Sequence, residues 1–312
     1  MAKYLTTAEA EAINQRLKIH QVPTEDGALT HDLHLYQSTF NQNGSNDNTP
    51  ILLFIHGFGE HIGMFEKFIY DFQQVKDVDI FHYNQRHHGA KFIKPDKVAH
   101  LDMPKFCQDL LTIVDYINKT FPGRNVYLNG NSLGGLIILT SAIKAPYAEK
   151  FAHLKIAGAN FENPYIQVHP NQANFFLKGL INVLGSFLPN VAVPKEIDTD
   201  GISNDPEWAK KIVADPLFQY KTSFGVAKKV IANSDDIFQN LAAWPKHVPY
   251  EIHLGGHDTI VDAEAGKKFY ELTKNYNEKN QIRIYEDAKH SIKGESGHVK
   301  ETFIKHFSSF LQ

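Results

Sequence analysis

Ser132 has the surroundings in this chain that most clearly indicate chemistry. It is the central residue of Gly130-Asn-Ser-Leu-Gly134, which follows the apolar run Val126–Leu128 and opens a stretch rich in leucine and isoleucine. A serine in a tight turn between a strand and a helix exposes its hydroxyl, and flanking glycines leave room for the backbone. The start of the helix adds positive potential where a negatively charged oxygen would form. The pattern therefore predicts a nucleophilic serine.

The same motif has a structural interpretation, in which the Ser132 hydroxyl only caps a helix. A G-x-S-x-G string also arises by chance, so its context has to decide between the two interpretations. The apolar run before the motif and the helical pattern after it favour the nucleophile.

A serine hydroxyl is a weak nucleophile until a base removes its proton, so this hypothesis requires a histidine and a carboxylate that orients it. With this motif, the expected chain order is serine, acid, histidine. Asp258 follows the apolar run Tyr250–Leu254, and His290 follows Ile282–Tyr285. We therefore expect loops at one edge of a sheet to carry Ser132, Asp258 and His290 together.

Neighbouring titratable residues offer alternatives. Asp262 is a second candidate for the acid, although a helix N-cap explains its position at least as well. His257 follows the strand after which the expected order places the acid, so His290 is the better candidate for the base. Glu286 and Asp287 precede the candidate histidine too closely to reach its ring, so we expect them to be solvated.

A glycine-rich segment, HGFGEH at residues 56–61, follows the apolar run Ile51–Ile55. Glycines there let a backbone N–H turn toward a reacting carbonyl, and the residue after the nucleophile supplies a second donor. We therefore expect the amides of Phe58 and Leu133 to form an oxyanion hole. The loss of one such donor typically raises the reaction barrier by about 3 kcal/mol.

Histidines at positions 56, 61, 87 and 88 suggest a metal site as a further interpretation. Neither pair has the i, i+4 spacing with a nearby glutamate that zinc proteases use, and no cysteine assists them. We expect neither a metal nor a cofactor.

Composition limits the partners and the compartment. A formal net charge of −3 without clustered lysine and arginine argues against nucleic acid as a partner. Cys107 is the only cysteine, so no internal disulfide is possible, which favours a reducing compartment. Residues 1–18 carry charges where a signal peptide needs an unbroken apolar stretch. We expect an intracellular, cytoplasmic protein that does not bind nucleic acid.

Short apolar runs alternate with longer amphipathic runs over most of the chain. This alternation predicts an α/β fold, with a mostly parallel central sheet and helices on both faces. The predicted strands are Ile51–Ile55, Val78–Tyr83, Asn125–Leu128, Lys155–Ala159, Tyr250–Leu254 and Ile282–Tyr285, and the predicted helices are Phe65–Gln74, Pro104–Lys119, Leu133–Ala145, Ala263–Thr273 and Val299–Phe310. Upstream, Leu29–Thr39 alternates enough to predict an antiparallel edge strand.

The alternation stops between residues 163 and 243, where helical pieces are separated by prolines. We expect residues 1–162 and 244–312 to form the core and residues 163–243 to form a helical cap over the strand ends, where open α/β sheets bind ligands. Within this insertion, Ala173–Val193 is too apolar for a fully solvated helix, but polar residues interrupt it, so we expect no transmembrane helix.

Two interpretations of Ala173–Val193 remain open, and they can hold for two faces of one helix. The structural interpretation is a cap helix packed on the core. The functional interpretation is that part of it lines an acyl channel or contacts a lipid surface. The second interpretation assigns substrate contacts to Phe175, Phe176, Leu180 and Leu184.

Four segments, HGFGEH, GNSLGG, HDTIVD and AKHSI, occur in an order that resembles the monoacylglycerol lipase and lysophospholipase group of α/β-hydrolases, with the yeast-type monoacylglycerol lipases nearest. The likeness covers residues 24–311, and residues 187–221 are similar to the cap of that group. The resemblance implies the α/β-hydrolase fold, with Ser132, Asp258 and His290 as a catalytic triad and the amides of Phe58 and Leu133 as oxyanion donors.

The resemblance also implies a substrate class. It points to a monoacylglycerol, cleaved to fatty acid and glycerol. The apolar segment Ala173–Val193 adds the expectation of peripheral contact with a membrane or lipid-droplet surface. Glu60 matches a position that helps to bind the glycerol end, and Asn131 lies at the same end, where histidine is usual. Met64 stands where an arginine often helps to hold the glycerol in that group. A lysophospholipase or general carboxylesterase is the alternative, and a non-catalytic binding protein on the same fold is the second alternative.

Overall fold

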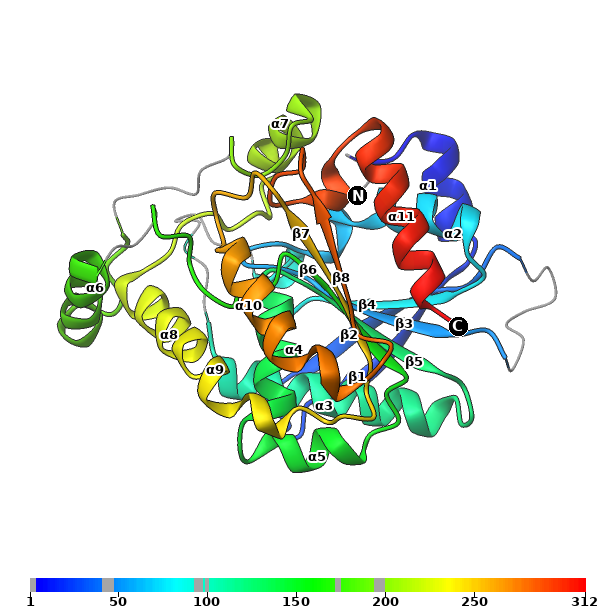
Figure 1. Ribbon diagram of the computed structural model, residues 1–312. Helices are drawn as coiled ribbons and strands as arrows, with labels where there is room; N and C mark the ends of the chain where they lie inside the picture. The colour runs from blue at the N-terminus through cyan, green and yellow to red at the C-terminus, as the bar shows by residue number, and fades with distance from the viewer. Residues whose placement is uncertain (1–3, 41–47, 93–97, 99–100, 172–174, 194–199) are drawn as a thin grey trace.

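One eight-stranded sheet organises the molecule (Figure 1). The computed structural model describes residues 4–40, 48–92, 98, 101–171, 175–193 and 200–312 of the 312-residue chain. The strands are β1 (Leu17–Pro23), β2 (Thr30–Tyr36), β3 (Ile51–Ile55), β4 (Asp79–Tyr83), β5 (Val126–Asn131), β6 (Gly158–Glu162), β7 (Tyr250–Gly255) and β8 (Gln281–Tyr285). Their spatial order is β1-β2-β4-β3-β5-β6-β7-β8. Pairing is parallel from β4 to β8, and only β1–β2 and β2–β4 are antiparallel.

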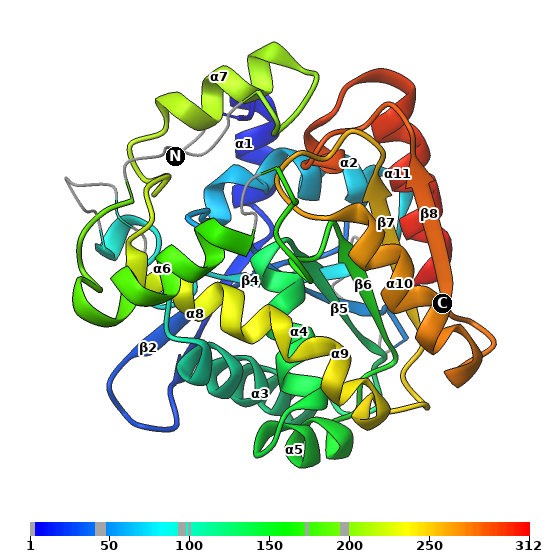
Figure 2. The same ribbon diagram turned by 60° about the vertical axis from the view of Figure 1, so that its left-hand side comes forward.

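The central strands are apolar on both faces because helices cover both faces. In β3, all five residues are buried. Leu53 and its neighbours at i±2 pack on one side with α3 (Met103–Thr120), α4 (Leu133–Ile143) and α10 (Ala263–Thr273). Leu52 and Phe54 pack on the other side with α1 (Thr7–Asn14), α2 (Glu66–Val75) and α11 (Gly297–Phe310). Figures 1 and 2 show these two helical layers on either side of the sheet.

Several helices begin at side chains that satisfy their first amides. Thr6 and Glu9 form a capping box at α1. Asp102 caps α3, and Asp262 caps α10 by accepting a hydrogen bond from the amide of Glu264. These polar caps fix where each crossover helix starts, and hence where each loop above the sheet ends.

The predicted α/β-hydrolase fold is confirmed, with two differences in its strands. The antiparallel strand expected at 29–39 is β2, but it is not the edge strand, because β1 pairs along its outer side. The strand expected at Lys155–Ala159 lies three residues later, as β6. The polar residues Asn160 and Glu162 are fully buried in β6, and such residues give no apolar signal in the sequence.

A helical insertion separates β6 from β7. It contains α6 (Phe175–Phe187), α7 (Pro206–Ala214), α8 (Phe224–Asp235) and the short α9 (Ile237–Asn240). Helix α5 (Tyr147–His153) lies outside the insertion, before β6. Helices α6 and α8 contact each other and lie side by side (Figure 2). Among the described residues, no helix combines the length and the apolar character needed to cross a bilayer.

Candidate active site

Ser132 lies in the turn between β5 and α4 in a conformation that L-residues rarely adopt, with φ 50° and ψ −113°. Other backbone segments pack closely against this turn. A Cβ at Gly134 would stand 2.1 Å from the carbonyl oxygen of Ile55, and one at Gly130 would stand 2.6 Å from the amide nitrogen of Gly135. Only glycine fits at these two positions, so the flanking glycines of the motif hold Ser132 against the end of β3. Backbone strain of this kind is typical of functional sites.

Asp258 and His290 meet above the ends of β7 and β8. The distance between His290 Nδ1 and Asp258 Oδ2 is 2.7 Å, and both side chains are buried. The other carboxylate oxygen of Asp258 accepts hydrogen bonds from the amides of Ile260 and Val261, at 2.8 and 3.0 Å. The amides fix the carboxylate, so its second oxygen stays aimed at the imidazole.

The pKa of His290 reflects this pairing. Burial lowers the pKa of an imidazole, but the negative charge of Asp258 and its hydrogen bond outweigh burial, so that the pKa lies above the usual 6.5. The carboxylate stabilises the protonated ring, which is the state that a general base reaches after it takes a proton.

Ser132 and His290 line one cavity of about 720 Å³. Its lining is mostly apolar and comes from loops at the carboxyl ends of the strands and from the insertion. The residues are Gly57, Phe58, Glu60, Asn131, Ser132, Tyr165, Val168, Leu177, Leu180, Ile181, Leu184, Val193, Ile202, Ile212, Phe218, Tyr220, Thr222, Phe224, Ala227, Val230, Ile231, Ile260, His290 and Ser291. The volume and the apolar lining suit a ligand with a long hydrocarbon portion.

The two expected amide donors lie on the loop after β3 and directly after Ser132, and both Phe58 and Ser132 line the cavity. Leu133 is the first residue of α4, and the amide of a first helical residue has no acceptor within its helix. Phe58 lies in the loop after β3, and no acceptor for its amide is found among the described residues. Both positions suit an oxyanion hole.

Glu60 organises the Phe58 loop. Its Oε2 accepts hydrogen bonds from the Gly57 amide at 2.6 Å and from Asn131 Nδ2 at 2.9 Å. This carboxylate therefore joins the loop after β3 to the residue that precedes Ser132. Glu60 and Asn131 both line the cavity and bind each other, and their expected role in substrate binding stays a prediction.

The insertion packs directly on the same loop. The Gln219 amide donates to the carbonyl oxygen of Gly59 at 2.9 Å, and its side chain donates to the carbonyl oxygen of His87 at 2.8 Å. Asp215 Oδ2 lies 3.2 Å from Nε2 of His61. Nothing in the spacing of the sequence pointed to Gln219, because a glutamine that binds backbone carbonyls leaves no motif.

Helix α6 faces the cavity with only part of its apolar surface. Leu180 and Leu184 line the cavity, but Phe176 does not, and its side chain is 84% exposed. The cavity lining therefore does not support its expected substrate contact. With 3.6 residues per turn, Phe176 lies on nearly the same side of the helix as the exposed Val183 and Phe187. The lining residues of α6, which are Leu177, Leu180, Ile181 and Leu184, centre about a quarter turn away. The side chain of Phe175 lies outside the described residues.

The alternative titratable residues lie elsewhere. Asp262 caps α10 and does not contact His290. His257, Glu286 and Asp287 are exposed. Within the described ranges, no group of three or more histidine, cysteine, aspartate or glutamate side chains is arranged to hold a metal ion.

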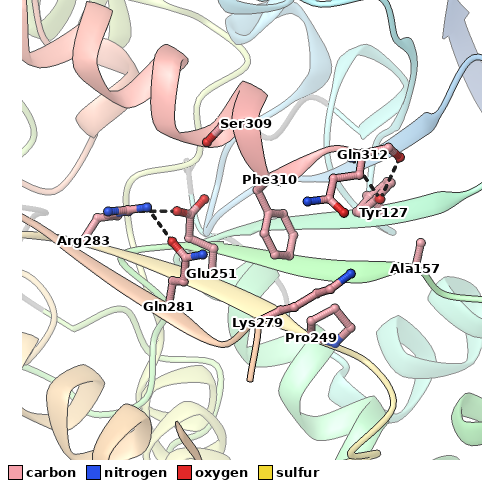
Figure 3. Close-up of a pocket in the computed structure, with 10 residues that line it drawn as sticks. All are labelled: Tyr127, Ala157, Pro249, Glu251, Lys279, Gln281, Arg283, Ser309, Phe310 and Gln312. Carbon is pink, nitrogen blue, oxygen red and sulfur yellow. Dashed lines mark hydrogen bonds and ion pairs between the residues drawn. The ribbon is translucent and has the colours of Figure 1, made fainter. Parts of the chain in front are cut away.

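A second, smaller cavity of about 120 Å³ lies at the opposite end of the sheet, where β5 to β8 begin (Figure 3). Its lining is largely polar and includes Glu251, Lys279 and Arg283. Arg283 Nε donates to Glu251 Oε1 at 3.0 Å, and Tyr127 donates to the carbonyl oxygen of Gln312 at 3.0 Å. None of the expected site residues lies there.

Comparison with known families places this geometry in context. A family model described as serine aminopeptidase, S33, matches residues 46–297. The monoglyceride lipase of Homo sapiens is 28% identical over 246 residues, covering 77% of this chain and 75% of the relative. The monoglyceride lipase of Saccharomyces cerevisiae is 26% identical over 263 residues, covering 80% of each.

Solved structures show the same fold. A soluble variant of monoglyceride lipase from Saccharomyces cerevisiae, in complex with a substrate analogue, superposes with a TM-score of 0.76 at 21% identity and covers 95% of both chains.

Proposed function

The chain belongs to the serine aminopeptidase, S33, family and is a serine hydrolase, and on that premise we propose that it cleaves the ester bond of monoacylglycerols to give fatty acid and glycerol. One observation carries the proposal: a strained serine and a histidine that is bonded to a buried aspartate line one large, mostly apolar cavity. The relatives named monoglyceride lipase in human and yeast support the substrate class.

The proposed reaction transfers the acyl group twice. His290 Nε2 takes the proton of the Ser132 hydroxyl as its oxygen attacks the ester carbonyl, and the amides of Phe58 and Leu133 hold the resulting oxyanion. The carbon–oxygen bond to glycerol then breaks, and the imidazolium gives its proton to the glycerol oxygen. Water, deprotonated by His290, attacks the acyl-enzyme, and the fatty acid leaves as Ser132 regains its proton. Asp258 holds the imidazole and stabilises its charged form throughout.

The cavity fits an ester with one polar and one apolar end. Glu60 and Asn131 supply polar atoms beside Ser132, where a glycerol group would lie. Leu180, Leu184 and the other aliphatic and aromatic lining residues would surround the acyl chain. Burial of a hydrocarbon chain contributes roughly 0.8 kcal/mol for each methylene group, which favours long acyl chains.

The insertion at residues 163–243 acts in this proposal as a helical cap on a core made of residues 1–162 and 244–312. Leu184 faces the cavity, whereas Phe176, Val183 and Phe187 are 84%, 54% and 80% exposed. An outward apolar helix face of this kind favours peripheral contact with a membrane or a lipid droplet. The enzyme would then act in the cytoplasm, at a lipid surface.

A hydrolysis panel tests the substrate class. It compares short- and long-chain monoacylglycerols, lysophosphatidylcholine and p-nitrophenyl butyrate by kcat/KM. We expect the highest value for a long-chain monoacylglycerol. A higher value for the lysophospholipid would instead assign a lysophospholipase, and a higher value for the butyrate would assign a general esterase.

Labelling by a fluorophosphonate probe tests the mechanism. We expect the wild-type protein to be labelled and Ser132→Ala to be unlabelled, with both giving the same circular dichroism spectrum. Equal labelling of the two proteins, or none of either, would contradict a Ser132 acyl-enzyme.

A further inference from the structure

Strand β6 holds none of the proposed triad residues, yet it lies at the centre of their support. It pairs with β5, which ends at the nucleophile, and with β7, which leads to Asp258. His290 follows β8, which is separated from β6 by β7. The loop that carries His290 must therefore reach back over the end of β7 toward Ser132. Contacts with the main chain of this loop are needed to fix it in that position.

Asn163, the first residue after β6, makes that connection. It is completely buried and has a φ of 42°, in the left-handed region that asparagine tolerates better than most residues. Its Nδ2 donates to the carbonyl oxygen of His290 at 2.7 Å and to that of Lys289 at 3.2 Å. Its Oδ1 accepts from the amide of Gly255 at 2.8 Å. One side chain thus bonds the main chain of the histidine and the last residue of β7.

The bonds of Asn163 extend the sheet past the end of its strands. The Asn163 amide donates to the carbonyl oxygen of His253 at 2.9 Å, which continues the pairing of β6 with β7. The side chain of Asn163 then acts as the next peptide group of the strand would. Its Oδ1 accepts a hydrogen bond from β7, and its Nδ2 donates to the histidine loop. Its bonds to the carbonyl oxygen of His290 and to the amide of Gly255 are buried, so loss of the side chain would leave these two backbone groups unsatisfied.

Glu162, the preceding residue, holds the same loops from a second direction. Its carbonyl oxygen accepts from the amide of Ser132 at 3.0 Å. Its carboxylate binds Lys293 through both the amide, at 3.0 Å, and Nζ, at 2.9 Å. Residues 162–163 therefore contact the serine turn, the end of β7 and the histidine loop.

We infer that Asn163 is a positioning residue for the Asp258–His290 pair, an inference that rests on the proposed function. It fixes the main chain of His290 relative to the end of β7, three residues before Asp258. This sets the imidazole at hydrogen-bonding distance from the carboxylate, in the cavity that Ser132 also lines. Misplacement of a reacting group by about 1 Å can cost about 100-fold in rate.

The insertion holds the outer side of the histidine loop but does not replace Asn163. The amides of His290 and Ser291 donate to the carbonyl oxygens of Gly201 and Ile202, at 3.2 and 2.7 Å. These bonds use the backbone N–H groups of the histidine loop, whereas Asn163 binds the backbone carbonyl oxygens of the same loop. The two sets of bonds fix opposite sides of the same peptide units.

Asn163→Gly is the first test variant, because glycine keeps the positive φ and removes only the side chain. We expect kcat for p-nitrophenyl butyrate to fall about 10- to 100-fold, with KM changed less than about threefold. The acid limb of the pH profile should move to lower pH, because a loosely held imidazole gains less from Asp258. The other charges near His290, Lys293 and Glu60, stay in place.

Asn160→Gly is the matched control. Asn160 is also completely buried in β6, but it binds the side chains of Asn129 and His253, away from the histidine loop. We expect a lower thermal midpoint but an unchanged kcat and acid limb at temperatures well below that midpoint. If Asn163→Gly behaves in the same way, its role is structural only and the inference is overturned.

Asn163→Asp provides a second variant if the glycine variant does not fold. It keeps an acceptor for the Gly255 amide but replaces the donor to the His290 carbonyl with a repelling oxygen. We expect a fall in kcat of similar size. A kcat within twofold of the wild-type value would overturn the inference.

A measurement on the histidine itself separates this inference from the proposed function. Proton NMR of the His290 ring reports the Nδ1 proton in its bond to Asp258 without any turnover. We expect a low-field signal in the wild-type protein and Asn160→Gly, and its upfield shift or loss in Asn163→Gly. If the signals behave in this way but the wild-type protein does not hydrolyse esters, only the proposed function is refuted. An unchanged signal in Asn163→Gly would instead refute the positioning role.

Discussion

At the carboxyl ends of the parallel strands, loops bring Ser132 and His290 to the wall of a cavity of about 720 Å³, and the carboxylate of Asp258 binds the imidazole. At the amino ends of the same strands, charged side chains bind each other around a cavity of about 120 Å³. Arg283 binds Glu251 in the lining of this cavity, and outside it, at the starts of β4 and β5, Arg124 Nη2 lies 2.8 Å from Asp79 Oδ2. The same strands thus end in the candidate active site on one side and begin in a region of internally paired charges on the other.

The difference follows from the direction of the chain. Every parallel strand leaves the sheet at the same end, so side chains distant in sequence meet there. At the amino ends, polar groups that meet are paired, as Arg124 is with Asp79 and with the carbonyl oxygen of Thr49 at 2.6 Å. We therefore expect substitutions at the carboxyl end to change rates and substitutions at the amino end to change stability.

Asp258→Asn should give the largest effect, because it removes the charge that orients and stabilises the imidazole. We expect kcat/KM to fall by about 10⁴-fold, as for loss of the acid in other triads. The raised pKa of His290 predicts a wild-type acid limb above pH 6.5, since protonation removes the base as the pH falls. Without the carboxylate, this limb should move to lower pH. A pH profile with an unmoved limb would contradict the pairing of the two residues.

Arg124→Ala should give the next largest effect, but on folding. It leaves the carboxylate of Asp79 buried without its cation, which costs about 3–5 kcal/mol in the free energy of unfolding. Urea denaturation measures this loss, and kcat of the folded fraction should stay within twofold of wild type. A large fall in kcat with unchanged stability would contradict the division between the two ends.

Leu184→Trp should give a moderate effect on selectivity by filling the cavity beside α6. We expect kcat/KM for long-chain monoacylglycerols to fall about 10-fold relative to short-chain ones, because the loss of a few methylene contacts costs about 1–3 kcal/mol. Val183→Trp is the matched control, since Val183 is the adjacent residue and is 54% exposed. Equal effects of both substitutions would argue against an acyl chain at Leu184.

Lys279→Ala should give the smallest effect. Lys279 is exposed at the rim of the amino-end cavity. We expect a change within about 0.5 kcal/mol in the free energy of unfolding and no change in kcat/KM. Loss of hydrolysis in this variant would show that the amino-end cavity takes part in the reaction.

Much of this architecture follows from local sequence patterns. The strand β3 is an uninterrupted apolar run, and α3 and α10 have a clear helical period, so their positions were predicted to within two residues. The distance of 2.7 Å between His290 and Asp258 agrees with the expected serine, acid, histidine order. Their catalytic roles stay predictions until the variants are measured.

Other parts gave no usable pattern, for physical reasons. Strand β1 has only one buried residue, Val22, so it lacks the apolar alternation of a strand. Strand β6 was placed three residues early because Asn160 and Glu162 are polar, and only their buried partners explain them. The same polarity that obscured β6 in the sequence supplies the bonds around the proposed triad. The orientation of Phe176 depends on the rotation of α6, which apolar content alone does not fix.

The contact between Gly59 and Gln219 has a consequence for protein engineering. A Cβ at position 59 would stand 2.0 Å from the carbonyl oxygen of Gln219, so only glycine allows the two backbones to come this close. Residues 57–61 and 215–220 therefore depend on each other's sequence, although they are distant in the chain. Chimaeras that exchange the insertion among homologues should carry the glycine-rich loop with it, and crossover points that divide the pair should yield poorly folded or inactive hybrids.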